Sequence, residues 1–212
     1  MTSQLGLRER KKQETRRIIF EAAQKLFRER GFDAVSVAEI ARAADVSEVT
    51  VFNYFPTKED LFYGGMTAFE DSLLDAVRSR RRGEPASKAF RRALFDTADA
   101  LRSKQRGDVI AEASKVITAS PSLLAREREI SERYTRLLAE LLATETGASP
   151  DEVEPMGVAS ALMGAHRAAV AYVRKEVLAG RRGTALAEGY KAQVTRAFAW
   201  LERGLGTYAV KT

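Results

Sequence analysis

Apolar residues recur at three- and four-residue spacing along most of the chain, which is typical of amphipathic helices. Within residues 8–30 the apolar stripe consists of Ile19, Ala22, Ala23, Leu26 and Phe27, and Gly31 ends it. We find no run of alternating apolar and polar residues that would predict a strand. The pattern predicts an all-α protein with about nine helices, following a loose tail at residues 1–7.

Two short helices joined by a tight turn are predicted in the stretch that follows. Ser36 opens the first as the capping box Ser-x-x-Glu, and Ser47 can cap the second. Between them the chain must turn at Asp45, a residue type that tolerates the left-handed conformation better than most. Pro56 ends the second helix. This arrangement predicts a helix-turn-helix whose second helix enters a DNA groove.

The two faces of the second helix predict different roles. Val51 and Phe55 share a face with Val46 and can pack on the first helix, at Ile40 and Ala41. The polar outer side can meet base edges, because Asn pairs with adenine, Glu accepts from cytosine, and Thr or Val touches the thymine methyl. We therefore predict base contacts by Glu48, Val49, Thr50 and Asn53. An alternative for Glu48 is that it is simply a favourable acid in a first helical turn.

Longer helices are predicted in the rest of the chain. Thr57 caps a helix that we expect to run to about residue 80. Further helices are expected over residues 86–102, 108–119, 120–146, 149–179 (with a second start at Pro155) and 184–205. The predicted domains are a helix-turn-helix domain of three helices at residues 1–57 and a larger helical regulatory and dimerisation domain at residues 58–212.

Composition narrows the class of protein. The net charge of +6 and the pI of about 9.6 suit a polyanionic partner without requiring one. The absence of cysteine excludes disulfides and thiolate metal sites, and it fits a reducing cytoplasm, where we expect the protein. Residues 156–173, the most apolar run, are interrupted by His166 and Arg167, so we expect a packed helix and no membrane span. With one histidine and no glycine-rich phosphate loop, we predict no enzyme, no cofactor and no metal site.

The segment from Thr15 to Leu61 resembles the TetR family of bacterial transcriptional regulators. The matching residues keep their order and spacing: Ile18, Ile19, Ala22, Ala23, Leu26, Phe27, Gly31, Phe32, Ser36, Val37, Ile40, Ala41, Ala44, Val46, Ser47, Thr50, Phe55, Lys58, Glu59 and Leu61. Three positions depart from the family pattern: Asp45 replaces the turn glycine, Val49 a small residue and Phe52 the favoured tyrosine. Phe52 lacks the hydroxyl that reaches a phosphate in relatives, and Tyr54 can supply one instead.

The resemblance implies a homodimer that binds a near-palindromic double-stranded DNA operator and is released by an unidentified small-molecule effector. A regulator without a ligand, acting architecturally or through a protein partner, remains the alternative. Phosphate contacts are predicted for residues at helix starts, where backbone N–H groups favour anions, and for nearby cations and hydroxyls. They are Ser36, Arg42, Ser47, Tyr54, Lys58, Arg16 and Arg17. Solvation alone is the alternative for each cation.

The C-terminal helices are predicted to form the dimer surface as a four-helix bundle, because small residues permit close approach. The predicted interface residues are Gly157, Ala161, Gly164, Ala165, Ala168, Tyr190, Val194 and Leu201. Burial of this slim helix within one protomer is the alternative. A ligand pocket is predicted from Phe69, Phe90, Leu94, Tyr134, Met163 and His166, although apolar residues at helical spacing are usually core. The alternative for His166 is a packing residue at the dimer interface. Trp200 is predicted to pack.

Overall fold

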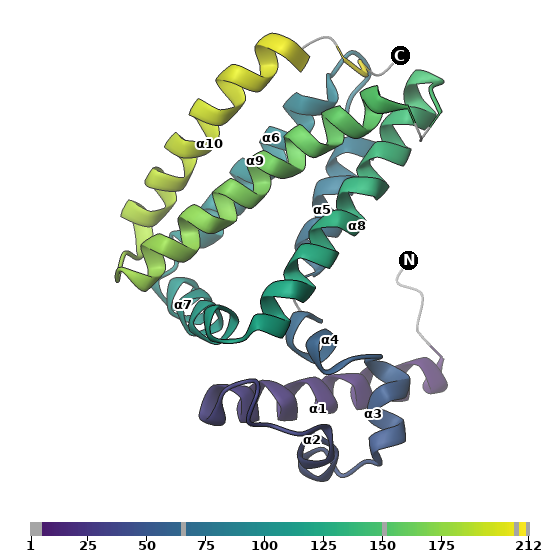
Figure 1. The fold of residues 1–212 in the computed structure, drawn as a ribbon, viewed down its shortest axis with the longest axis vertical. Helices are drawn as coiled ribbons and strands as arrows, with labels where there is room; N and C mark the ends of the chain where they lie inside the picture. Colours follow the sequence, from purple (N-terminus) through teal and green to yellow (C-terminus); the bar gives the residue numbers. More distant parts are fainter. Residues whose placement is uncertain (1–5, 65–66, 150–151, 206–207, 211–212) are drawn as a thin grey trace. The chain divides into compact units, whose positions relative to one another are not determined.

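The computed structural model describes residues 6–64, 67–149, 152–205 and 208–210, and these contain ten α-helices (Figure 1). The all-α fold class is confirmed. The expected helix over residues 58–80 is wrong, because the structure has two helices there, α4 (Lys58–Tyr63) and α5 (Thr67–Arg78). Gly64 ends α4, and a Cβ atom on it would lie 3.0 Å from the Phe55 ring. The same Cβ atom would lie 2.8 Å from the Asp60 carbonyl oxygen, so a side chain fits here only if its neighbours shift.

The remaining helices follow the predicted order. They are α1 (Leu7–Arg30), α2 (Val37–Ala43), α3 (Glu48–Tyr54), α6 (Ala86–Leu101), α7 (Lys104–Ala119), α8 (Pro121–Thr146), α9 (Val153–Leu178) and α10 (Gly183–Leu205). Helix α7 begins four residues earlier than expected, at Lys104 instead of residue 108. Of the cap predicted at residues 149–152, Pro150 and Asp151 lie outside the described residues, and Pro155 falls within the first turn of α9.

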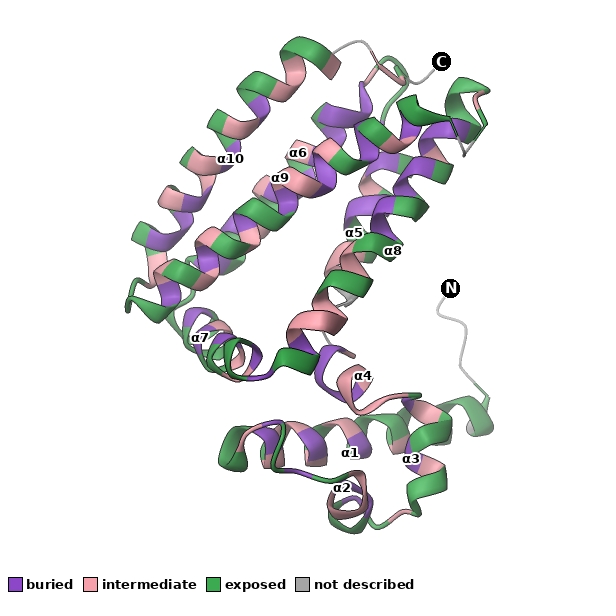
Figure 2. Ribbon diagram, in the orientation of Figure 1, coloured by how far each residue is buried: buried purple, intermediate pink, exposed green. Residues whose placement is uncertain are grey.

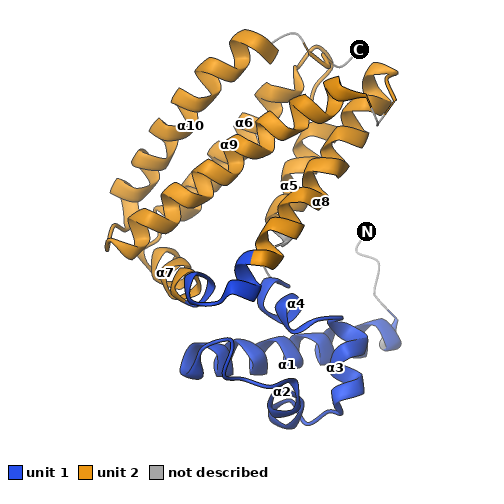
Figure 3. Cartoon of the chain, in the orientation of Figure 1, with its two compact units in different colours: residues 1–67, 116–124 blue, residues 68–115, 125–212 orange. Residues whose placement is uncertain are grey.

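The chain forms two compact units, shown in different colours in Figure 3. The smaller unit contains residues 1–67 and 116–124, and the larger contains residues 68–115 and 125–212. We call the smaller unit the head. The functional boundary predicted at residues 57 and 58 stays a prediction.

The head has a small apolar core that is shared by its four helices. Ile19, Ile40 and Val51 are each fully buried. Gln24 of α1 donates hydrogen bonds to the carbonyl oxygens of Leu61 and Phe62, at 3.0 and 3.3 Å, and so fixes α4 against α1. The aromatic rings of the core lie within 6.1 Å of one another, centroid to centroid, for Phe27, Phe32 and Phe62. Such pairs add stability beyond the area they bury.

Residues 116–124 complete the head although they lie far along the chain. Tyr63 Oη donates to the carbonyl oxygen of Leu123 at 3.0 Å. Ser120 Oγ donates to Asp33 Oδ1 at 2.8 Å, next to the turn between α1 and α2. The junction of α7 and α8 is therefore hydrogen-bonded to the same body as the helix-turn-helix.

The larger unit is built around α6, α9 and α10. Phe90 of α6 stacks on Phe198 of α10, with ring centroids 6.4 Å apart. Figure 2 shows buried residues along α6, α9 and α10 and exposed residues on their outer sides. None of the helices in the described ranges combines the length and apolarity needed to cross a membrane.

A buried arginine ties the larger unit together near the end of the chain. The Arg80 side chain has no exposed surface and forms an ion pair with Glu145 of α8. It also donates to the carbonyl oxygens of Val77, Glu84 and Ala209, at 2.6, 3.0 and 2.8 Å. A charge at this depth is stable only because every one of these partners is present.

Candidate nucleic-acid interface

The turn between α2 and α3 has the hydrogen bonds of a Schellman motif. The Val46 N–H donates to the carbonyl of Ala41 at 3.0 Å, and the Asp45 N–H donates to that of Arg42 at 3.3 Å. Asp45 has φ of 53°, the left-handed conformation that the sequence required at this position. Ser47 then caps α3 by accepting from the Thr50 N–H at 3.1 Å. These local bonds fix the direction in which α3 leaves the turn.

A buried wedge orients α3. Val51 and Phe55 are buried on its inner side, against a core that contains Ile40 and Ala41. Because the inner side is fixed, the residues about 100° and 200° further round the helix must face solvent. The outer side carries two exposed apolar side chains, Val49 at 70% and Phe52 at 47%.

The residues predicted for base contacts share this outer side. Glu48, Val49 and Asn53 are exposed, whereas Thr50 is half-buried and its hydroxyl is 2.8 Å from Ser47 Oγ. Phe52 was not predicted as a base contact, although its position next to Val51 already placed it outside the wedge. An exposed phenylalanine can contact a thymine methyl. The base contacts of Glu48, Val49, Thr50 and Asn53 stay predictions.

Two cations of the head, Arg16 on α1 and Lys58 at the start of α4, lie over aromatic rings. Lys58 Nζ lies 4.2 Å from the centroid of the Phe32 ring, and the Arg16 guanidinium lies 4.7 Å from that of Phe55. Burial lowers the pKa of Lys58, and the nearby acids Asp33, Glu59 and Glu39 act in the opposite direction. Cation–π contacts restrict long side chains, so both charges are positioned before any partner arrives.

The remaining residues predicted for phosphate contact differ in whether their polar groups already have a partner within the protein. Arg17 is paired with Glu14 and Glu21, at 2.6 and 2.7 Å, and these hydrogen bonds raise its pKa. Ser36 Oγ lies 2.9 Å from a carboxylate oxygen of Glu39 within the capping box. Arg42 and Ser47 are exposed and Tyr54 is half-buried. Their phosphate contacts stay predictions, and Arg17 and Ser36 would have to give up an existing partner.

The Glu39 carboxylate of the capping box accepts hydrogen bonds from both α1 and the start of α2. Glu39 accepts from the Ser36 backbone N–H at 2.9 Å and from Arg30 at 2.6 Å. The backbone hydrogen bond from Ser36, followed by the bond from Arg30, lowers the pKa of Glu39 to about 2. The start of α2 is thereby fixed to the end of α1.

The face of α1 that buries Ile19 continues as a row of cations toward the N-terminus. Arg16, Lys12 and Arg8 precede Ile19 by three, seven and eleven residues, spacings that keep them on its side of the helix. All three are exposed, and Arg16 lies over the Phe55 ring at the end of α3. Where a helix face extends beyond its core and carries only positive charge, a polyanion is the complementary partner.

The predicted pocket residues fall into two groups within the core of the larger unit. Phe69 and His166 pack with ring centroids 5.3 Å apart, and Met163 lies one turn before His166 on α9. Tyr134 Oη donates to Asp71 Oδ1 at 2.7 Å. Phe90 and Leu94 are instead fully buried on α6, where Phe90 meets α10. A ligand contact by any of the six stays a prediction.

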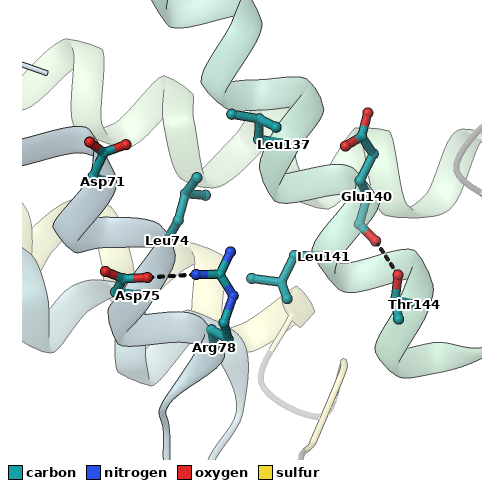
Figure 4. A pocket seen from close by; sticks show the side chains of 8 residues that line it. All are labelled: Asp71, Leu74, Asp75, Arg78, Leu137, Glu140, Leu141 and Thr144. Carbon is teal, nitrogen blue, oxygen red and sulfur yellow. Dashed lines mark hydrogen bonds and ion pairs between the residues drawn. The ribbon is translucent and has the colours of Figure 1, made fainter.

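An open cleft lies on the seam between α5 and α8, with a volume of about 560 Å³ (Figure 4). None of the six predicted pocket residues lines it. Its lining combines three leucines with acidic and polar side chains, and the Arg78–Asp75 ion pair spans 2.6 Å on one side. The lining residues are Asp71, Leu74, Asp75, Arg78, Leu137, Glu140, Leu141 and Thr144.

The residues predicted for the dimer surface differ in exposure. Gly157 and Ala168 are exposed, and Ala161, Gly164, Ala165 and Leu201 are half-buried. Tyr190 and Val194 are instead buried in the core of their own unit, so they leave almost no surface for a second protomer. The expectation that Trp200 packs is wrong within a protomer, because its side chain is 73% exposed. Trp200 follows the buried Phe198 by two residues, which places it on the outer side of α10.

Two family descriptions match the chain. Residues 19–63 match the family described as bacterial regulatory proteins, tetR family, and residues 84–205 match the MftR C-terminal domain. The transcriptional regulator TcmR of Streptomyces glaucescens is 30% identical over 69% of this chain and 67% of its own length. A Mycobacterium tuberculosis protein named as a mycofactocin biosynthesis transcriptional regulator, MftR, is 29% identical over 73% of this chain and 77% of its own length.

A solved structure shares the fold. That of NalD, named as the secondary repressor of the MexAB-OprM multidrug efflux pump in Pseudomonas aeruginosa, aligns with a TM-score of 0.58. It covers 88% of this chain and 96% of NalD at 18% identity, so the likeness concerns the fold alone.

Proposed function

Because this chain belongs to the TetR family of bacterial regulatory proteins and carries an MftR-type C-terminal domain, we propose that it is a homodimeric repressor that a small molecule releases from a palindromic operator. Family membership makes the chain a DNA-binding transcriptional regulator and not an enzyme. Repression, dimerisation and release by a ligand are the proposed parts. A further relative, from Rhodococcus jostii, is named the repressor KstR and is 27% identical over 66% of this chain.

The outer side of α3 supports the proposal that this helix contacts the bases of the operator. It presents Glu48, Val49, Phe52 and Asn53 while the Val51–Phe55 wedge holds its inner side. Asn53 pairs with an adenine, and the two apolar side chains contact thymine methyl groups. The cations over aromatic rings, Lys58 and Arg16, bind the flanking phosphates, and Arg8 and Lys12 extend this contact along the backbone.

Operator reading is tested by selecting bound sites from random DNA and then scanning every base pair of the selected site. Asn53→Ala should reduce discrimination by about 1–3 kcal/mol at one base pair of each half-site and leave the others unchanged. Lys25→Ala, an exposed cation on the outer side of α1, serves as the control. An unaltered base preference at every position would show that Asn53 does not contact a base.

The outer sides of α9 and α10 support the proposed dimer. Small residues at Gly157, Ala161, Gly164 and Ala168 leave α9 slim, and Trp200 projects from α10. Two such helices from each protomer form a four-helix bundle, with Trp200 as a large apolar anchor. Dimerisation supplies the two heads that a palindromic operator requires, one helical turn of DNA apart.

Trp200 is the only tryptophan, so intrinsic fluorescence reports on the proposed interface directly. Dilution that separates the protomers should shift the emission to longer wavelength, because the indole becomes hydrated. Sedimentation of the wild type and of Trp200→Ala should show a dimer weakened by the substitution. A monomer at all concentrations in the wild type would rule out the homodimer.

Release by a ligand is supported by the path of the chain. Helices α7 and α8 meet at residues 116–124, which belong to the head and are bonded to the rest of it through Tyr63–Leu123 and Asp33–Ser120. A ligand that binds among the helices of the larger unit and displaces this junction would alter the orientation of α3. Such a ligand must prefer the conformation that cannot bind DNA. A compound screen that follows thermal stability and operator release together distinguishes this mechanism from control by a protein partner.

A further inference from the structure

Three helices of the larger unit carry polar side chains along segments that contact one another. We call this the α5–α8–α9 layer, defined by residues 69–71, 127–134 and 163–174. Three side-chain contacts join its helices: the rings of Phe69 and His166 at 5.3 Å, Tyr134 Oη to Asp71 Oδ1 at 2.7 Å, and Arg167 Nη1 to Ser131 Oγ at 3.1 Å.

Buried polar atoms without a hydrogen-bond partner among the described residues gather in this layer. They are His166 Nδ1, Glu70 Oε2 and Arg174 Nε. His166 is only 5% exposed, so bulk solvent does not hydrate its imidazole. Leaving one such atom unpaired costs about 1–3 kcal/mol, so several in one layer indicate partners supplied from outside the chain.

The layer favours an uncharged partner. Burial lowers the pKa of His166 to about 4, so its imidazole favours the neutral form, and burial also raises the pKa of Glu70. Arg174 is already neutralised by Glu127 at 2.7 Å. An ionised group inserted among these buried atoms would lose its hydration.

Apolar side chains lie beside the imidazole, and the charged group that acts on it is Arg167. The Phe69 ring packs on one side, and the buried Met163 precedes His166 by one helical turn. A neutral imidazole still offers one hydrogen-bond donor and one acceptor. The open α5–α8 cleft includes in its lining Asp71, the residue after Glu70.

The geometry points to a ligand site in the α5–α8–α9 layer that binds a neutral, largely apolar molecule through a hydroxyl group hydrogen-bonded to His166. Glu70 and Arg174 are partners for any further polar atoms of the ligand. The identification of this ligand as the effector rests on the proposed function, whereas its binding does not.

Three probes of similar shape separate the relevant properties: 2-naphthol, which is neutral with a hydroxyl; 2-methylnaphthalene, which has no polar group; and 2-naphthoate, which is charged. His166 is the only histidine, so its imidazole nitrogen resonances are identified without mutants. We expect 2-naphthol to shift the Nδ1 resonance and to bind about tenfold more tightly than 2-methylnaphthalene, the effect of one hydrogen bond to a buried group. We expect 2-naphthoate to bind more weakly than 2-naphthol.

A pair of variants tests the same site in the full-length protein. His166→Phe keeps an aromatic ring against Phe69 and removes both nitrogens, so it should lower the affinity for 2-naphthol about tenfold and leave that for 2-methylnaphthalene unchanged. Ser87→Ala removes another buried hydroxyl without a partner, outside the layer, and should change neither. Thermal unfolding of both variants establishes that they fold.

Two results would overturn the proposal. One is an unchanged His166 resonance with every probe, which would assign its nitrogen to an ordered water. The other is binding of 2-naphthoate as tight as that of 2-naphthol. If 2-naphthol binds at His166 but leaves operator affinity unchanged, the site stands and release through it does not. If other compounds release DNA equally from the wild type and His166→Phe, the proposed function stands and the layer is not its ligand site.

Discussion

Lys58 offers a quantitative test of how the head binds DNA. Lys58 begins α4, and its Nζ lies 4.2 Å from the ring centroid of the buried Phe32. Lys58→Met keeps an apolar stem over Phe32 and removes the charge. The substitution should therefore leave the fold unchanged and remove one phosphate contact from each head.

The magnitude follows from counterion release. Each phosphate contact contributes about 0.9 to the slope of log affinity against log salt concentration. A dimer with two heads should therefore lose about 1.8 from this slope, and a single head about 0.9. Between 50 and 200 mM salt, a fourfold range, the affinity of the variant should fall about 12-fold less than that of the wild-type dimer.

Fluorescence anisotropy with operator and scrambled duplexes across this salt range measures both quantities. The loss at low salt should be similar for the two duplexes, because a phosphate contact carries no sequence information. Lys25→Met, at an exposed cation on the outer side of α1, should leave the slope unchanged. A loss confined to the operator, or a slope that Lys58→Met does not alter, would refute the phosphate role.

Three further predictions concern stability. Asp45→Val should lower the free energy of unfolding by about 1–2 kcal/mol, because a β-branched residue is strained at φ of 53°, whereas Asp45→Gly should not; equal losses in denaturant titrations would contradict the turn geometry. Glu145→Ala should cost about 3–5 kcal/mol because it leaves Arg80 charged and buried, and adding Arg80→Met should recover most of that loss; a double variant as unstable as the single one would contradict it. His166 has a folded pKa of about 4, below its usual 6.5, so the stability that it contributes is present above pH 6.5 and is lost as the pH falls toward 4. The loss should be about 3 kcal/mol and absent from His166→Phe; parallel pH profiles of chemical unfolding for the two proteins would show that His166 is not the titrating group.

Local chemistry explains how much of the head could be predicted from the sequence. The caps at Ser36, Ser47 and Thr57 each bond to a backbone N–H three residues away, so they form wherever their short motif occurs. The need for a left-handed residue at Asp45 follows from the two helices that flank it. The exposed side of α3 could be predicted in the same way, because burial of Val51 and Phe55 on one side of the helix leaves their neighbours on the other side.

Contacts between distant segments were decided only by the tertiary structure. Helical spacing identified apolar stripes on the last two helices, but it could not say which residues the protomer itself covers: Tyr190 and Val194 face α6 and the core, while Trp200 is left outside. Gly64 lies against the Phe55 ring, which a side chain at this position would meet. Arg80 looks like any surface cation in the sequence, and its burial depends on Glu145 and Ala209, at least 65 residues away.

The same distinction applies to the cations of the head. The sequence by itself predicted phosphate contacts for Arg16 and for Lys58, which begins the helix after the recognition helix. Only the folded core decided that each charge lies over an aromatic ring, because Phe32 and Phe55 reach those positions through packing. Short-range hydrogen bonds and helical periodicity are encoded within a few residues, whereas burial depends on which distant side chain fills the opposite side.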